Sequence, residues 1–223
     1  MAVPEALEAF ATTVGPESDE VLVEMDRRAE ETGFPTVGPA VGGWLQQLTG
    51  LLSAGRVFEF GSGFGYSAYW FLRGMDEAGE IVLTEIDSEK LDDARRNLER
   101  GGFASQARFE HGDAIEIVTD YRRPFDIALI DNEKHRYVDA FEAIRSQVPV
   151  GGIVVADNAI RGPFEFETLS ALVDGGDPAE VGDPNADAAR GIAAYLGHVR
   201  SVDAFETTLL PLGEGLAVSR RVF

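Results

Sequence analysis

Residues 57–67 read VFEFGSGFGYS, an apolar run followed by glycine at every second position. The run Val57–Phe60 is typical of a β-strand, and helical spacing begins near Ser67. Glycines at such a turn let the backbone approach a ligand and adopt dihedral angles that other residues avoid. A strand, a glycine-rich turn and a helix in this order predict one unit of an α/β sheet.

The alternation continues from Arg56 to Ala156. Short apolar runs predict strands at Val57–Phe60, Ile81–Ile86, Ala107–Glu110, Phe125–Ile130 and Ile153–Ala156. Helical stretches lie between them at Ser67–Met75, Glu89–Arg100, Ala114–Asp120 and Tyr137–Gln147. We therefore expect a doubly wound, Rossmann-like parallel sheet with helices on both faces.

The chain before this region is expected to be helical. Its apolar spacing is broken at Gly15-Pro16 and again at residues 32–35, and a third helix is expected over Val41–Leu52. We expect one domain over residues 1–223, in which residues 1–52 form a helical lid or cap, or an interface, and residues 53–223 form the core.

The C-terminal part differs in composition. Residues 162–187 are rich in Asp, Gly and Pro and are expected to contain a loop, followed by a helix over Ala188–Ser201. Phe205–Pro211 and Gly215–Arg221 predict two strands joined by the tight turn 212–214. Strands with so short a link pair antiparallel, so one hairpin is expected at an edge of the sheet.

Composition excludes several classes of protein. The chain has 223 residues, 44% of them hydrophobic, which is enough for a sizeable core and argues against disorder. It has no cysteine, so disulfides, thiolate metal sites and cysteine nucleophiles are excluded. No apolar run reaches the ~20 residues that span a bilayer, and no signal peptide is recognisable, so we expect a cytoplasmic protein.

The charge is strongly negative, with 19 basic and 39 acidic residues and a net charge of −20. Such a surface repels nucleic acid and acidic membranes, so neither is an expected partner. Only two of the basic residues are lysines, Lys90 and Lys134. This composition resembles that of proteins from salt-loving archaea, although an ordinary acidic bacterial protein is the alternative.

The glycine turn and the strand ends beside it indicate a nucleoside site. The spacing G-x-G-x-G of Gly61, Gly63 and Gly65 differs from the G-x-G-x-x-G that cradles a pyrophosphate, although a turn needed only for packing is the alternative. Glu85 ends the second strand, where a carboxylate can accept both hydrogen bonds of a ribose diol. The turn at Asp113 could contact an adenine ring or simply cap a helix.

Two further strands end on acidic residues. Asp131 follows one apolar run, and Asp157-Asn158 follow the next. If the two strands are neighbours, two carboxylates and an amide oxygen converge into a hard oxygen site suited to Mg²⁺. The alternative is that each Asp caps the turn or helix that follows it.

Lys134 follows Asp131 by three residues and can reach the same pocket. A lysine close to a divalent cation is pushed toward its neutral form and can act as a general base. A surface lysine is the alternative, but a chain with two lysines favours the functional interpretation. Lys90 has no such context, since it is expected on an exposed acidic helix.

Together these residues resemble the cation-dependent, S-adenosylmethionine-dependent O-methyltransferases, the family of catechol and caffeoyl-CoA O-methyltransferases. The matching segments are FEFGSGFGYS, TEID, GDA, FDIALIDNEKHRY, GGIVVADN and the tail FETTLLPLGEGLAVSRR. Asn132-Glu133 and His135 depart from the commoner residues at the pocket mouth, and residues 164–187 match no specificity pattern.

The resemblance implies a fold, a cofactor and site residues. It implies the class I methyltransferase fold, a seven-stranded sheet with its last pair reversed, S-adenosyl-L-methionine and a divalent cation, Mg²⁺ in the first instance. The implied metal ligands are Asp131, Asp157 and Asn158, with Lys134 as catalytic base. The cofactor contacts are Val37, Glu59, Gly61, Ser62, Gly63, Gly65, Ser67, Glu85, Asp113, Ala114 and Asp131.

The function expected on these grounds is methyl transfer to a hydroxyl of a small catechol-like or phenolic acceptor. Two alternatives are a nicotinamide-dependent oxidoreductase on a similar sheet and a non-catalytic nucleoside-binding module. The expected partner is the small hydroxyl acceptor, and a homodimer is possible because relatives occur both as monomers and as dimers.

Overall fold

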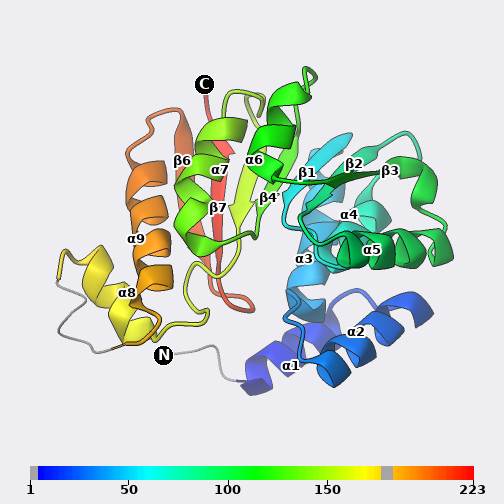
Figure 1. Ribbon diagram of the computed structural model, residues 1–223, viewed down its shortest axis with the longest axis horizontal. Coiled ribbons are helices and arrows are strands. Elements are labelled where there is room, and N and C mark those ends of the chain that lie inside the picture. The colour runs from blue at the N-terminus through cyan, green and yellow to red at the C-terminus, as the bar shows by residue number, and fades with distance from the viewer. Residues whose placement is uncertain (1–4, 177–182) are drawn as a thin grey trace.

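The computed structural model describes residues 5–176 and 183–223. Its centre is a seven-stranded sheet in the order β3-β2-β1-β4-β5-β7-β6 (Figure 1). The strands are β1 (Arg56–Phe60), β2 (Glu80–Glu85), β3 (Ala107–His111), β4 (Ile127–Ile130), β5 (Ile153–Ala156), β6 (Phe205–Leu210) and β7 (Leu216–Arg221). The predicted α/β sheet with an antiparallel C-terminal pair is confirmed.

Strand order and register place the predicted site residues along one edge. The chain runs from β1 outward to β2 and β3, then crosses to β4 and β5 on the other side of β1. In register, Phe60 lies beside Ile130 and Ile130 lies beside Ala156. The next residues, Gly61, Asp131 and Asp157, are therefore neighbours at the carboxyl edge, where open α/β sheets bind ligands.

The C-terminal hairpin reaches the same edge from the other direction. β7 pairs antiparallel with β5, and Ala217 near the start of β7 lies opposite Ala156 at the end of β5. Since β7 runs against its neighbour, the β6–β7 turn lies beside the carboxyl ends of the parallel strands.

Helices cover both faces of the sheet (Figure 1). Successive strand residues point to opposite faces, so Val57 packs with one group of helices and Phe58 with the other. The first group is α2 (Glu20–Thr32), α3 (Gly38–Leu52), α4 (Tyr66–Gly74) and α5 (Ser88–Arg100). The second is α6 (Ala114–Ile117), α7 (Tyr137–Ile144), α8 (Phe166–Val173) and α9 (Ala186–Arg200). The predicted helical cap also contains α1 (Glu5–Val14), which contacts α3.

Helix α8 lies in the segment that was expected to contain a loop. Its apolar side chains Leu169 and Leu172 are three residues apart and pack into the core cluster beside α9. The Asp183 carboxylate accepts hydrogen bonds from the Glu165 backbone and the Thr168 hydroxyl. The flanking Asp, Gly and Pro residues conceal this short helical period in the sequence. Residues 177–182 of that segment lie outside the described residues.

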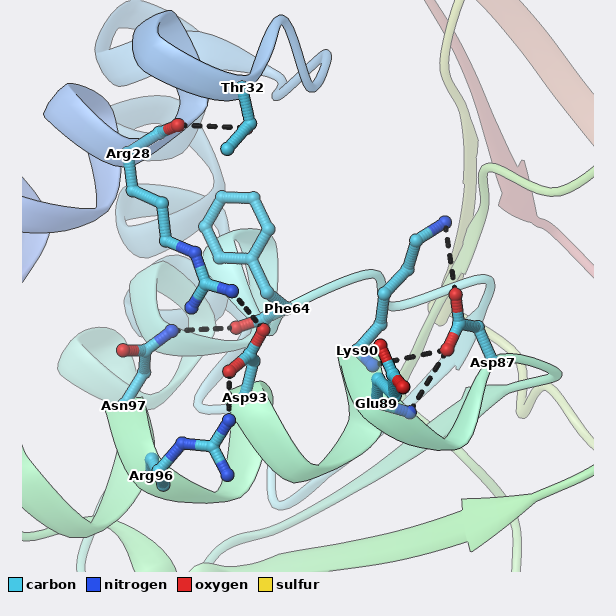
Figure 2. A network of polar contacts seen from close by, with 9 residues as sticks. All are labelled: Arg28, Thr32, Phe64, Asp87, Glu89, Lys90, Asp93, Arg96 and Asn97. Carbon is cyan, nitrogen blue, oxygen red and sulfur yellow. Dashed lines mark hydrogen bonds and ion pairs between the residues drawn. The ribbon is translucent and has the colours of Figure 1, made fainter.

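A polar network ties α2 and the glycine turn to α5 (Figure 2). Arg28 of α2 and Arg96 of α5 both pair with the Asp93 carboxylate, and Asn97 donates to the carbonyl oxygen of Phe64 (3.0 Å). Helix α5, which follows β2, thus holds the glycine turn in place. Among residues 5–176 and 183–223, no helix has the length and apolarity needed to cross a membrane.

Candidate functional site

A cavity of about 780 Å³ opens at the carboxyl edge of the sheet. It is bordered by the ends of β1, β2, β4 and β5 and by the loop 34–37 that precedes α3. The predicted site residues that line it are Val37, Gly61, Ser62, Gly63, Ser67, Glu85, Asp113, Ala114, Asp131, Lys134, Asp157 and Asn158. Two predicted cofactor contacts, Glu59 and Gly65, lie outside this lining.

The glycine turn fits between two strand ends. Gly61 has a φ of +82°, and a Cβ atom there would lie 2.8 Å from the Asp131 carbonyl oxygen. No larger residue can take this place without moving β4. Gly65 serves another purpose, because it is the N-cap residue of α4 and lies against Ala94 of α5. Its predicted cofactor contact stays a prediction.

Glu85 is held at the cavity wall by backbone donors. Its carboxylate accepts hydrogen bonds from the amides of Gly63 (2.9 Å) and Asp87 (3.0 Å). Asp87 caps α5 by accepting from the amides of Glu89 and Lys90. Each carboxylate oxygen can accept more than one hydrogen bond, so Glu85 can still accept from a diol.

Glu59 is a buried acid without a hydrogen-bond partner. Neither carboxyl oxygen is paired with any described residue. Burial raises the pKa of Glu59 to about 8, and the negative charge of Asp131 adds to the rise. An orphaned carboxyl group two residues before the glycine turn is compatible with a cationic group of a cofactor.

The turn after β3 caps a helix and borders the cavity, while its predicted contact with adenine stays a prediction. Asp113 caps α6 by accepting from the amide of Ile115 (3.0 Å), and it also lines the cavity. The Arg136 guanidinium donates to its carboxylate (2.7 Å) and holds the pKa of Asp113 below its usual value.

Asp131, Asp157 and Asn158, here called the acidic cluster, lie at the neighbouring ends of β4 and β5. Asp131 and Asp157 follow paired residues of neighbouring strands, and Asn158 stands next to them with a φ of +57°. Burial, and then the negative charge of Asp131, raise the pKa of Asp157 to about 8. Burial also raises the pKa of Asp131, although Lys134 opposes that rise. Two carboxylates that disfavour each other's charge in this way favour a cation between them.

The donor set is suited to a hard divalent cation. Within the described part of the chain, no group of three or more His, Cys, Asp or Glu side chains is arranged to hold a metal ion. The predicted ligands are the carboxylates of Asp131 and Asp157 and the amide of Asn158. All three are oxygen donors, which fits Mg²⁺ better than zinc.

Lys134 is held inside the cavity. Its Nζ donates to the Asp131 carboxylate (3.0 Å) and to the Tyr137 hydroxyl (2.8 Å). Burial, and then the charge of Asp131, raise the pKa of Tyr137 well above its usual value, so this side chain stays a neutral phenol. The ammonium group is thus aimed at the cluster by two fixed neighbours.

Three residues at this site were not predicted from the sequence to take part in it. Tyr137 is described above, and Glu214 of the β6–β7 turn also lines the cavity. Lys90 was expected on an exposed helix, and its side chain is 40% exposed; it also lines the same cavity, with its Nζ 4.9 Å from the centroid of the Phe34 ring. The sequence predicts the hairpin that carries Glu214 but not that β7 pairs with β5, which is what brings its turn to the ligand edge.

The chain is similar to known proteins over nearly its whole length. The model of a family described as O-methyltransferase matches residues 15–222. The chain belongs to the O-methyltransferase family. The match confirms the predicted enzyme, an S-adenosylmethionine-dependent O-methyltransferase, and favours methyl transfer over nicotinamide chemistry.

Individual relatives of this O-methyltransferase are moderately similar. A catechol O-methyltransferase of Niastella koreensis is 32% identical over 83% of this chain and 82% of its own length. Another from Mycobacterium tuberculosis is 30% identical over 90% of this chain and 87% of its own. The fold matches that of an O-methyltransferase from Bacillus cereus in complex with SAH, with a TM-score of 0.81, 23% identity and 97% coverage of both chains.

Proposed function

We propose that this O-methyltransferase moves a methyl group from S-adenosylmethionine to a hydroxyl of a small catechol-like or phenolic acceptor, with a divalent cation. The observation that carries the proposal is the placement of Lys134 and Asp131 against Asp157-Asn158, in the cavity that the glycine turn borders. The names of the two curated relatives support a catechol-like acceptor.

The cofactor would be held along β1 and β2. The glycine turn would admit it, Glu85 would accept from the ribose diol, and the buried carboxyl group of Glu59 would counter a positive charge on the cofactor. The Asp113 turn would border the adenine. Holding two reactants in line supplies up to ~7–11 kcal/mol of the barrier in favourable cases.

The acceptor would lie at the acidic cluster. Asp131, Asp157 and Asn158 would hold the cation, which when bound makes a hydroxyl more acidic. A bound cation would push Lys134 toward its neutral form, so that its Nζ could take the hydroxyl proton, while the Asp131 carboxylate and the Tyr137 hydroxyl keep that atom in place. A vicinal pair of hydroxyls fits this arrangement best, because one cation can bind both oxygens.

The substitution Glu85→Ala is expected to weaken binding of S-adenosylhomocysteine at least tenfold. The ribose diol loses two hydrogen bonds to a charged group, each worth ~1.5–3 kcal/mol. Isothermal titration calorimetry measures the change. Asp92→Ala is the matched control, because Asp92 is an exposed acid on α5 that does not line the cavity. An unchanged dissociation constant in Glu85→Ala would remove this residue from the cofactor site.

We also propose that the fold is adapted to high salt. At a net charge of −20, self-repulsion destabilises the compact state when the Debye length grows to ~30 Å at 0.01 M salt. The melting temperature should therefore rise steadily as KCl goes from dilute to molar. Sucrose of equal osmolality is the control for water activity. A melting temperature that does not respond to KCl contradicts the proposal.

A further inference from the structure

The β6–β7 turn is attached to the segment that follows the acidic cluster. The amides of Ile160 (3.1 Å) and Arg161 (2.8 Å) both donate to the Glu214 carbonyl oxygen, and the amide of Ala159 donates to that of Gly215 (2.8 Å). A Cβ atom on Gly215 would lie 2.4 Å from Cγ1 of Ile160, so the turn approaches this closely only with glycine there. The backbone of Glu214 is therefore held at a set position beside Asn158.

The Glu214 side chain makes a specific contact. Nδ2 of Asn158 donates to its Oε2, and both residues line the cavity. An ionised carboxylate only accepts hydrogen bonds, whereas an amide has a donor end and an acceptor end. The atom of the Asn158 amide that faces Glu214 must therefore be the donor, Nδ2. Its Oδ1 is thereby left for another partner.

The rest of Asn158 is also restrained. Its backbone is in the left-handed region, with a φ of +57°, and its amide donates to Oδ1 of Asp157 (2.8 Å). With the backbone held, the choice between the two amide orientations depends on what the side chain meets. In the described structure, Glu214 is the charged group that makes this choice.

We propose that Glu214 is a positioning residue that directs Oδ1 of Asn158 toward the divalent cation. The inference rests on the proposed function, since it concerns the same cation. Residues that orient metal ligands from outside the ligand set are typically worth about 10- to 100-fold in metal affinity. Glu214 acts through a neutral amide, so its acceptor atom matters more than its charge.

The test measures Mn²⁺ binding rather than activity, by electron paramagnetic resonance of free Mn²⁺ in titrations of the purified protein. Glu214→Ala should weaken binding about 10- to 100-fold. Glu214→Gln should bind Mn²⁺ nearly as well as the native protein, because its side-chain carbonyl accepts the same hydrogen bond. Glu8→Ala is the charge control, since the charge of Glu8 acts on Glu214 without touching Asn158.

A double-mutant cycle separates positioning from direct ligation. In the background Asn158→Ala, the further change Glu214→Ala should have no effect on Mn²⁺ affinity. The proposal is overturned if Glu214→Ala binds like the native protein, if Glu214→Gln is as weak as Glu214→Ala, or if the loss persists without Asn158. A native protein that binds no Mn²⁺ instead contradicts the metal in the proposed function, and the inference falls with it.

Discussion

Replacing Lys134 by alanine is expected to lower turnover by ~10²–10⁴-fold, the loss typical of a missing general base. Binding of Mn²⁺ should persist, because the substitution leaves Asp131, Asp157 and Asn158 in place. Turnover should recover in part at higher pH, where the acceptor hydroxyl ionises without help. Single-turnover methyl transfer to a catechol, measured across pH in molar KCl, gives the result.

The substitution Lys134→Arg distinguishes the base from a positive charge. Arginine keeps an ion pair with Asp131 but stays protonated at every accessible pH. If Lys134 acts as a base, Lys134→Arg should be about as slow as Lys134→Ala. If the charge alone matters, Lys134→Arg should approach native turnover. Native turnover of Lys134→Ala at neutral pH would contradict the assignment altogether.

Replacing Asp157 by alanine is expected to weaken divalent affinity by more than the ~10- to 100-fold typical of an outer-shell residue. One of two carboxylates is then missing from the proposed oxygen set, and activity should return in part at high Mg²⁺. Calorimetric titration with Mg²⁺ and methyl transfer at rising Mg²⁺ measure the two effects. An enzyme that stays fully active in chelator would show that the metal assignment is wrong.

The substitution Asp157→Asn is a matched control, for which we expect a rise in melting temperature. Burial and the charge of Asp131 both disfavour an ionised Asp157, so the native pair repels when no cation is bound. Asp157→Asn should therefore melt at a higher temperature than the native protein in chelator at pH 9. Added Mg²⁺ should raise the melting temperature of the native protein and leave that of the variant almost unchanged.

The local elements were largely predictable because their causes are local. The strand, glycine turn and helix at residues 57–67 follow from apolar spacing and from the dihedral angle that Gly61 requires. The cap at Asp87 follows from the same kind of rule. Helix α8 was not predicted, because its two-turn apolar period is too short to stand out from the surrounding Asp, Gly and Pro.

The candidate site was predictable where it depends on parallel strands alone. Neighbouring parallel strands end at the same edge, so acids placed just after two apolar runs meet if those strands pair. The observed register of β4 and β5 brings Asp131 and Asp157 together in this way. Their roles as ligands, and that of Lys134 as base, stay predictions that the experiments above address.

The sequence by itself determined the α/β class, the nucleoside-type turn and the acidic residues at the strand ends, since each depends on residues close together in the chain. Only the tertiary structure decided that Glu214 stands against Asn158 and that Lys90 faces the same cavity as Lys134. Asn158 and Glu214 are 56 positions apart. Their contact depends on β7 pairing with β5, and that pairing is selected by packing across the whole sheet rather than by any local pattern.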